Sequence, residues 1–162
     1  MPTRFLCDNC QLSGTSFRES GTGVAIVPEE DEHVRFFRLD CAAFRNHYGL
    51  QSRGVCDLLV EYCRGTKNSV DLFTELKGSG YGHAARQIEC AFSVLHGELR
   101  ACQKGVRFRA LIVASASSPP NQKALVRQLR KKGLNEVFFK TGVKRGVVVS
   151  LRPFLNNQDR QG

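Results

Sequence analysis

Two apolar, strand-like runs separated by a short polar segment constrain the fold of this chain more than any other feature. The first run covers residues 56–63 and the second covers residues 70–78, while the segment between them, 64–69, is rich in residues that favour turns. A connection of this length is typical of a β-hairpin. We therefore predict two neighbouring strands in which the start of the first lies close to the end of the second.

Charged residues lie where these two strands are expected to meet. Asp57 opens the first strand, whereas Glu75 and Lys77 close the second. Side chains two positions apart on a strand point to the same face, so Glu75 and Lys77 share a face, and the hairpin brings Asp57 close to Glu75. Paired carboxylates hold hard divalent cations, and an ammonium beside them orients a water or stabilises developing phosphate charge. The pattern predicts a metal-dependent phosphodiesterase site.

The order of these residues resembles the motif of the PD-(D/E)xK nuclease superfamily. Asp57 is followed by Glu75-x-Lys77 and then by a segment with helical spacing, and Cys56 stands where the motif often has proline. A group of small prokaryotic nuclease-like proteins in that superfamily is similar over residues 55–90, through Cys56-Asp57-Leu58-Leu59, Phe73-Thr74-Glu75-Leu76-Lys77-Gly78-Ser79 and His83-Ala84-x-x-Gln87-Ile88. The resemblance implies an α/β protein with a restriction-endonuclease-like mixed β-sheet flanked by helices, which hydrolyses phosphodiester bonds in DNA with Mg²⁺ or Mn²⁺.

The same resemblance implies a role for each residue of the site. Asp57 and Glu75 would bind the cation together with the backbone carbonyl of Leu76, and Lys77 would orient the attacking water. Gln87, on the helix that follows, would support this arrangement. The expected enzyme is a Mg-dependent endonuclease or exonuclease.

A further acid upstream of the aspartate strand is common in relatives of this superfamily. Asp40 and Glu19 are the residues here that could supply it, and their spacing does not choose between them. Asp40 is preferred as an additional metal ligand because it closes an apolar strand-like segment. Asp71 is a weaker candidate: it shares a face with Glu75 if the strand is regular, but a bulge would turn it to solvent.

Each of these residues also has an interpretation in which it neither binds a metal nor takes part in catalysis. Glu75 and Lys77 could form a solvated ion pair on an edge strand, which contributes little. Asp57 could cap a strand end that faces water, and Gln87 could be an exposed helix residue. His83 is expected to be a polar residue at a helix start, because a hard cation prefers oxygen ligands.

The charge of the chain favours a polyanionic partner. The chain has 24 Lys and Arg against 15 Asp and Glu, a formal net charge of +9. A basic amphipathic helix is expected over residues 121–131, and four of its cations would contact a phosphate backbone without reading bases: Lys123, Arg127, Arg130 and Lys131. An ordinary solvated helix face is the alternative. Among nucleic acids we expect DNA rather than RNA.

Hydrophobic spacing predicts the remaining elements. The expected elements are strands at 23–27, 34–41, 107–115, 136–140 and 147–151 and helices at 81–97 and 121–131. Gly133 is expected to end the second helix, and residues 42–54 to form a connection. The strand at 107–115 is apolar enough to be buried on both faces. One nuclease-like domain is expected over 1–154, with a flexible polar tail over 155–162.

Cysteine usage indicates a reducing compartment. Seven cysteines form an odd set without the spacing of a disulfide framework, and no apolar signal segment precedes them. Cys7-x-x-Cys10 could be half of a zinc knuckle, but no matching pair accompanies it. We therefore expect reduced thiols and a cytoplasmic protein. No apolar run approaches the roughly 20 residues that cross a bilayer, so no membrane partner is expected.

The leading hypothesis is a metal-binding, DNA-binding nuclease that acts in defence or in DNA processing. Two alternatives stay open. One is a catalytically inactive nuclease-fold subunit that binds nucleic acid or assembles with other proteins, and the other is an RNase or toxin-like effector. A homodimer and a complex with a partner protein subunit are both compatible with the sequence.

Overall fold

The computed structural model describes residues 3–66, 68–77 and 80–156. Within them the chain forms a mixed α/β structure, which confirms the predicted class. The large sheet contains β3 (Glu32–Arg38), β4 (Leu58–Arg64), β5 (Asn68–Lys77), β6 (Arg107–Ala114) and β7 (Glu136–Lys140). The small sheet contains β1 (Ser16–Glu19), β2 (Thr22–Ala25) and β8 (Val148–Ser150). The helices are α1 (Arg4–Asn9), α2 (Ala42–Tyr48), α3 (Tyr81–Cys102), α4 (Gln122–Lys132) and α5 (Arg152–Leu155).

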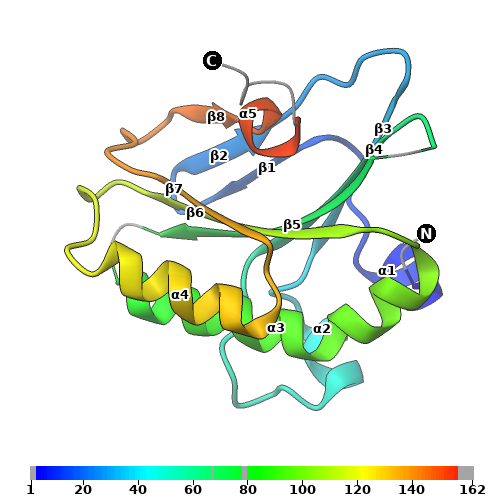
Figure 1. Ribbon diagram of the computed structural model, residues 1–162, viewed down its shortest axis with the longest axis horizontal. Coiled ribbons are helices and arrows are strands. Elements are labelled where there is room, and N and C mark those ends of the chain that lie inside the picture. Colours follow the sequence, from blue (N-terminus) through cyan, green and yellow to red (C-terminus); the bar gives the residue numbers. More distant parts are fainter. Residues whose placement is uncertain (1–2, 67, 78–79, 157–162) are drawn as a thin grey trace.

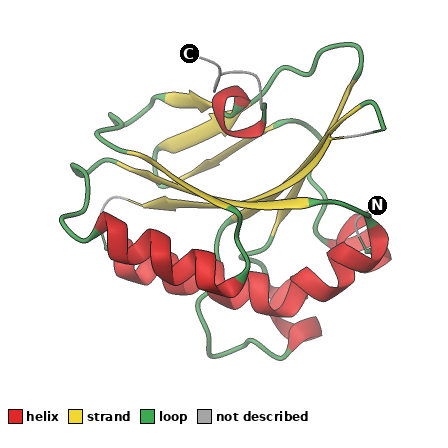
Figure 2. Cartoon of the chain, viewed as in Figure 1, coloured by secondary structure: helices red, strands yellow, loops and turns green. Residues whose placement is uncertain are grey.

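The large sheet separates two layers (Figure 1). Its strands lie in the order β3-β4-β5-β6-β7, antiparallel from β3 to β5 and parallel from β5 to β7. Helices α3 and α4 cover one face, and the small sheet with α5 covers the other (Figure 2). The sheet is therefore mixed, as predicted, but a second sheet rather than long helices fills most of the second layer.

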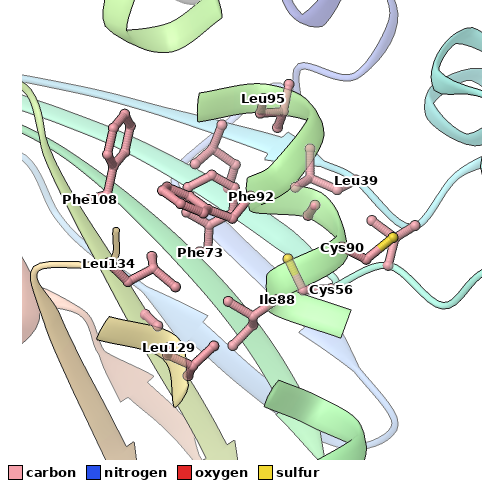
Figure 3. Close-up of a cluster of buried hydrophobic side chains, with 14 of the residues drawn as sticks. Leu39, Cys56, Phe73, Ile88, Cys90, Phe92, Leu95, Phe108, Leu129 and Leu134 are labelled. Carbon is pink, nitrogen blue, oxygen red and sulfur yellow. The ribbon is translucent and has the colours of Figure 1, made fainter. Parts of the chain in front are cut away.

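Side chains of β5 alternate between the two layers, as the pleat of a strand requires. Phe73 faces the helices and packs edge to face against Phe92 of α3, with ring centroids 5.5 Å apart (Figure 3). Leu72 and Leu76 belong to the hydrophobic cluster that faces the small sheet. Glu75 has the same strand parity as Phe73, so its side chain projects on the side of the sheet that α3 covers.

Strand β6 is buried on both faces, as its apolar run predicts. All of its residues except Arg107 are buried. Ala110 and Ile112 pack in the helix layer, whereas Leu111 and Val113 pack against the small sheet. This double cover holds the neighbouring strand β5 in the middle of the molecule.

The segment 42–54, predicted as a connection, contains helix α2. Phe44 is buried, and Gly49 ends the helix in a left-handed conformation with φ of 67°. A helix with one deeply buried residue has too short an apolar period to be recognised from spacing. Helix α1 and strand β1 likewise have no counterpart among the predicted elements.

Of the two predicted helices, α3 is longer than expected and α4 has the expected length. Helix α3 continues past Gly97 to Cys102 because Leu95 and Leu99 extend its buried face. Helix α4 ends at Gly133, as predicted, where φ is 115°. None of the helices in the described ranges has both the length and the apolar character needed to cross a bilayer.

The predicted polar tail begins with structured residues. Leu155, the last residue of α5, is buried. Residues 157–162 of that tail lie outside the described part of the chain.

Candidate active site

Asp57 and Glu75 are cross-strand neighbours at one end of the large sheet. The register of the β4–β5 ladder pairs Leu58 with Thr74, so Asp57 lies opposite Glu75, one position before β4 begins. The backbone N–H of Asp57 donates a hydrogen bond of 3.0 Å to Oε2 of Glu75. The backbone N–H of Leu76 donates one of 2.8 Å to Oδ2 of Asp57. These reciprocal bonds hold both carboxylates in place, and the hairpin predicted from the sequence brings them together.

Lys77 completes the predicted cluster. Its Nζ lies 3.3 Å from Oε1 of Glu75, and the side chain is 28% exposed, against 2% for Glu75. The ammonium therefore stands between a buried carboxylate and the solvent, where it can reach a bound molecule while it remains paired with Glu75.

Burial makes the two acids difficult to ionise in the protein alone. Desolvation, with repulsion from Asp57, raises the pKa of Glu75 to about 8, although Lys77 opposes the shift. Desolvation also raises the pKa of Asp57 to about 6, against the hydrogen bond from Leu76. One ammonium thus leaves two buried carboxylates undercompensated, a situation that a bound cation would relieve.

The backbone of Leu76 lies beside Asp57. In an extended strand the N–H and C=O of one residue point toward the same neighbouring strand. Because the N–H of Leu76 reaches Asp57, its carbonyl is also directed to that side of β5. The carbonyl of the next residue, Lys77, points the opposite way, toward β6, as expected for a strand. There it accepts a hydrogen bond from the N–H of Ser115. The Leu76 carbonyl is therefore suitably directed to act as the predicted third ligand.

The donor set fits a hard cation with few protein ligands. The described residues contain no group of three His, Cys, Asp or Glu side chains that could hold one ion. The side-chain donors are thus the carboxylates of Asp57 and Glu75, with the Leu76 carbonyl as a backbone donor. An all-oxygen set that leaves several positions to water suits Mg²⁺ or Mn²⁺.

Asp40 does not join this donor group. Its carboxylate forms an ion pair with Arg45 of α2. Asp40 acts on the site through its charge, which contributes to the raised pKa of Asp57, and Glu19 acts in the same way with a larger effect. Glu19, on β1, lines the same pocket as Lys77, so the structure places the less favoured of the two acids beside the site.

Gln87 of α3 is buried against the segment that leads into Asp57. Its Nε2 donates a hydrogen bond of 3.3 Å to the carbonyl of Val55, and its backbone carbonyl accepts one from Cys56. Its Oε1 is buried and has no hydrogen-bond partner among the described residues. Gln87 is therefore buried rather than exposed, and it contacts the segment that leads into Asp57 rather than Lys77.

The other candidates lie away from the site. Asp71 shares the parity of Glu75 but lies four positions back along β5, about 13 Å away at 3.3 Å per residue. It is fully buried opposite Glu61. His83 is exposed at the start of α3. The Cys7-x-x-Cys10 pair is not part of a metal-binding group of three ligands among the residues described.

The four predicted nucleic-acid contacts form one exposed basic face of α4. Lys123, Arg127, Arg130 and Lys131 all line the same open hollow along this helix. The N-terminal end of α4 lies near the end of β5 (Figure 1), and the Tyr81 hydroxyl at the start of α3 donates a 2.6 Å hydrogen bond to the Ser117 carbonyl in the preceding loop. The first turns of α4 are therefore nearer to the candidate site than its last turn.

A pocket of about 510 Å³ opens beside Lys77. Its lining residues come from the β1–β2 turn, the ends of β5 and β6, and the loop before β8: Glu19, Ser20, Gly21, Thr22, Leu76, Lys77, Ser115 and Arg145. The sequence did not indicate this pocket, because Arg145 and the β1–β2 turn meet only through the pairing of β2 with β8.

The family of the chain is not indicated by overall similarity to other proteins. Comparison with protein-family models, curated proteins and solved structures returns no match. The resemblance to nucleases therefore depends on the motif and on the local geometry of Asp57, Glu75 and Lys77.

Proposed function

We propose that this protein is a metal-dependent nuclease of restriction-endonuclease-like fold that hydrolyses phosphodiester bonds in DNA with Mg²⁺ or Mn²⁺. The observation that carries the proposal is the reciprocal hydrogen bonding of Asp57 and Glu75 beside the ammonium of Lys77. This arrangement holds two buried carboxylates close together before any cation binds, and one lysine does not compensate their charge.

Each residue of the site has a chemical role in this proposal. Asp57, Glu75 and the Leu76 carbonyl would hold the cation, which when bound screens the phosphate oxygens and lowers the pKa of a bound water. Lys77 orients the attacking water and stabilises the negative charge that develops on the phosphate. Gln87 keeps the segment before Asp57 in position through Val55. Holding these groups ready lowers the entropic cost of reaching the transition state.

The surroundings of the site support a nucleic-acid substrate. The net charge of +9 attracts a polyanion. Lys123 and Arg127 project from the part of α4 that is nearer to the site, so they could contact the backbone of a strand that reaches Lys77. The fold supports the proposal in a coarser way: a mixed sheet carries the Glu75-x-Lys77 strand in its centre, and helix α3 follows that strand.

Cleavage of plasmid and oligonucleotide DNA with and without Mg²⁺ tests this function. We expect Mg²⁺-dependent cleavage that EDTA abolishes and that Lys77→Ala reduces by at least about 100-fold, as for loss of one charge-stabilising group. DNA affinity should change little. Lys104→Ala is the matched control, because Lys104 is an exposed lysine between α3 and β6, at the opposite end of the large sheet. Equal cleavage by wild type and Lys77→Ala would defeat the proposal.

One observation favours a second candidate, a catalytically inactive binding subunit. Only two side-chain carboxylates meet in the described residues, and the pKa of Glu75 is raised to about 8, so protons compete with a cation for the site. Such a subunit would bind DNA equally well in EDTA and would cleave neither DNA nor RNA with any divalent ion. An RNase would be distinguished by cleavage of RNA alone.

A further inference from the structure

Arg145 lies across the turn between β1 and β2. A Cβ atom at Gly21 would stand 3.0 Å from Cγ and 3.1 Å from Nε of Arg145, so the arginine stem rests on the glycine. Gly21 has φ of 80°, a conformation that a larger residue adopts at a cost. The close approach of the arginine thus depends on glycine at this position.

Backbone hydrogen bonds hold the loop that carries Arg145 against this turn. The N–H of Gly146 donates to the carbonyl of Gly21 at 2.7 Å, and the N–H of Gly23 donates to the carbonyl of Val147 at 3.3 Å. Both bonds attach the loop to the turn directly after the arginine. A side chain held in this way loses less conformational entropy when it binds a ligand.

The turn itself is a tight two-residue reversal. Ser20 has φ of 50°, and it is the single residue other than glycine in the described ranges with positive φ. Ser20 and Gly21 connect the paired residues Glu19 and Thr22, so the reversal takes two residues, both with positive φ. Two-residue hairpins favour this geometry because its twist matches that of the flanking strands, so the turn gives Arg145 a fixed surface to lie on.

The charges in the pocket favour an anion beside Lys77. Its charged lining residues are Glu19, Lys77 and Arg145. Lys77 is paired with Glu75, and Glu19 is 3.9 Å from Arg38. Within the described residues, no ion pair or hydrogen bond engages the guanidinium of Arg145. A guanidinium presents parallel N–H donors that match the oxygens of a phosphate.

We infer that Arg145 holds the phosphodiester group next to the scissile one in a bound DNA strand, and that the pocket receives the nucleotide that carries it. This inference rests on the proposed nuclease function and adds a residue that positions the substrate. The pocket volume of about 510 Å³ falls within the range of about 300–1,000 Å³ found for ligand sites. Lys77 would act on the scissile group, while Arg145 on the other side of the pocket fixes the register of the strand.

Binding of fluorescein-labelled duplex DNA, measured by anisotropy in EDTA, tests the contact without requiring cleavage. Arg145→Ala should raise Kd about tenfold and reduce the slope of log Kd against log salt concentration by about 0.9, the value for one phosphate contact. Arg145→Lys should restore the slope and only part of the affinity. Arg107→Ala is the control, because Arg107 is an exposed arginine at the opposite end of β6 and should leave Kd unchanged. Equal Kd values and slopes for wild type and Arg145→Ala would overturn the inference.

A substrate with one neutral phosphate locates the contact. At a mapped cleavage site, replacement of single flanking phosphates by methylphosphonate should raise KM for the wild type at one position adjacent to the scissile bond. Arg145→Ala should lose sensitivity at that position alone, with kcat little changed. Equal sensitivity of both proteins at every position would reject the role of Arg145. By contrast, absence of cleavage by wild type with Mg²⁺ and Mn²⁺ would reject the nuclease function itself, whatever the binding result.

Discussion

The carboxylates of Asp57 and Glu75 each accept a hydrogen bond from a backbone N–H of the opposite strand. The N–H of Asp57 donates to the carboxylate of Glu75, and the N–H of the residue after Glu75 donates to the carboxylate of Asp57. This reciprocity forces two acids into one buried space, with the pKa of each raised. The cost of keeping them together is the main reason to expect a cation there.

A divalent cation should therefore stabilise the wild-type protein. Mn²⁺ at a hundred times its Kd should increase the free energy of unfolding by about 2.7 kcal/mol. Glu75→Gln keeps an acceptor for the N–H of Asp57 but removes one anionic ligand, so most of this stabilisation should disappear. Thermal unfolding with and without Mn²⁺ measures the effect, and Asp8→Asn, an exposed acid in α1, is the control. A Mn²⁺ response in Glu75→Gln equal to that of the wild type would contradict the ligand assignment.

Asp71 should make the stability of the protein depend on pH. Burial, with repulsion from Glu61, raises the pKa of Asp71 from 3.8 to about 8. Neither of its carboxylate oxygens has a hydrogen-bond partner among the residues described. The folded state therefore binds a proton more tightly than the unfolded state, and the stability from this group is present below about pH 4 and is lost as pH rises to about 8.

Asp71→Asn should remove this loss. The difference in Tm between variant and wild type should favour the variant increasingly from about pH 5 to about pH 8 and then level off, because the amide does not ionise. Thermal unfolding across this range measures it, with Asp8→Asn as an exposed control that should leave the profile unchanged. A difference in Tm that is constant with pH would show that Asp71 is not the titrating group.

The basic face of α4 should contribute affinity for DNA without sequence preference. A double variant that reverses both charges, Lys123→Glu with Arg127→Glu, should weaken DNA binding at least about tenfold at low salt. The slope of log Kd against log salt concentration should fall by about 1.8. The same reversal at Lys104 and Arg107, at the opposite end of the large sheet, should have a much smaller effect. Anisotropy over a salt series measures both. Equal effects of the two pairs would indicate general charge attraction rather than a surface on α4.

Gln87 should influence catalysis through the position of Asp57. Gln87→Ala removes the hydrogen bond to the Val55 carbonyl and should lower the free energy of unfolding by about 1–3 kcal/mol. We expect kcat to fall about tenfold and the Kd for Mn²⁺ to rise, with KM for DNA unchanged. Gln128→Ala, which breaks a comparable bond to Glu89 between α4 and α3, controls for a loss of stability alone. A similar loss of kcat in Gln128→Ala would show that Gln87 affects catalysis only through the stability of the protein.

The local pattern of the hairpin was sufficient to predict where Asp57 and Glu75 lie. The strand period and the connection length together determine the cross-strand pair, and both can be read from neighbouring residues. The burial of β6 followed for a similar reason, since an uninterrupted apolar run needs cover on both faces.

The pairing that the sequence did not reveal joins strands that lie far apart along the chain. Strands β2 and β8 correspond to the strands predicted at 23–27 and 147–151, but no local pattern indicated that they pair in parallel through Gly23 and Val148. The preference for Asp40 over Glu19 failed to anticipate which acid lies beside Lys77, because the position of β1 follows from that pairing. The role of Arg145 could not be inferred before this sheet was known.

The pairing of β2 with β8 also has a consequence for biosynthesis. An emerging polypeptide that already contains Asp57, Glu75 and Lys77 still lacks Arg145 and the strand that attaches the β1–β2 turn to the rest of the protein. During translation the residues of the candidate site therefore emerge well before those that complete the neighbouring pocket. A ribosome-bound fragment that ends before Arg145 lacks one wall of that pocket, and its hairpin alone is at best marginally stable.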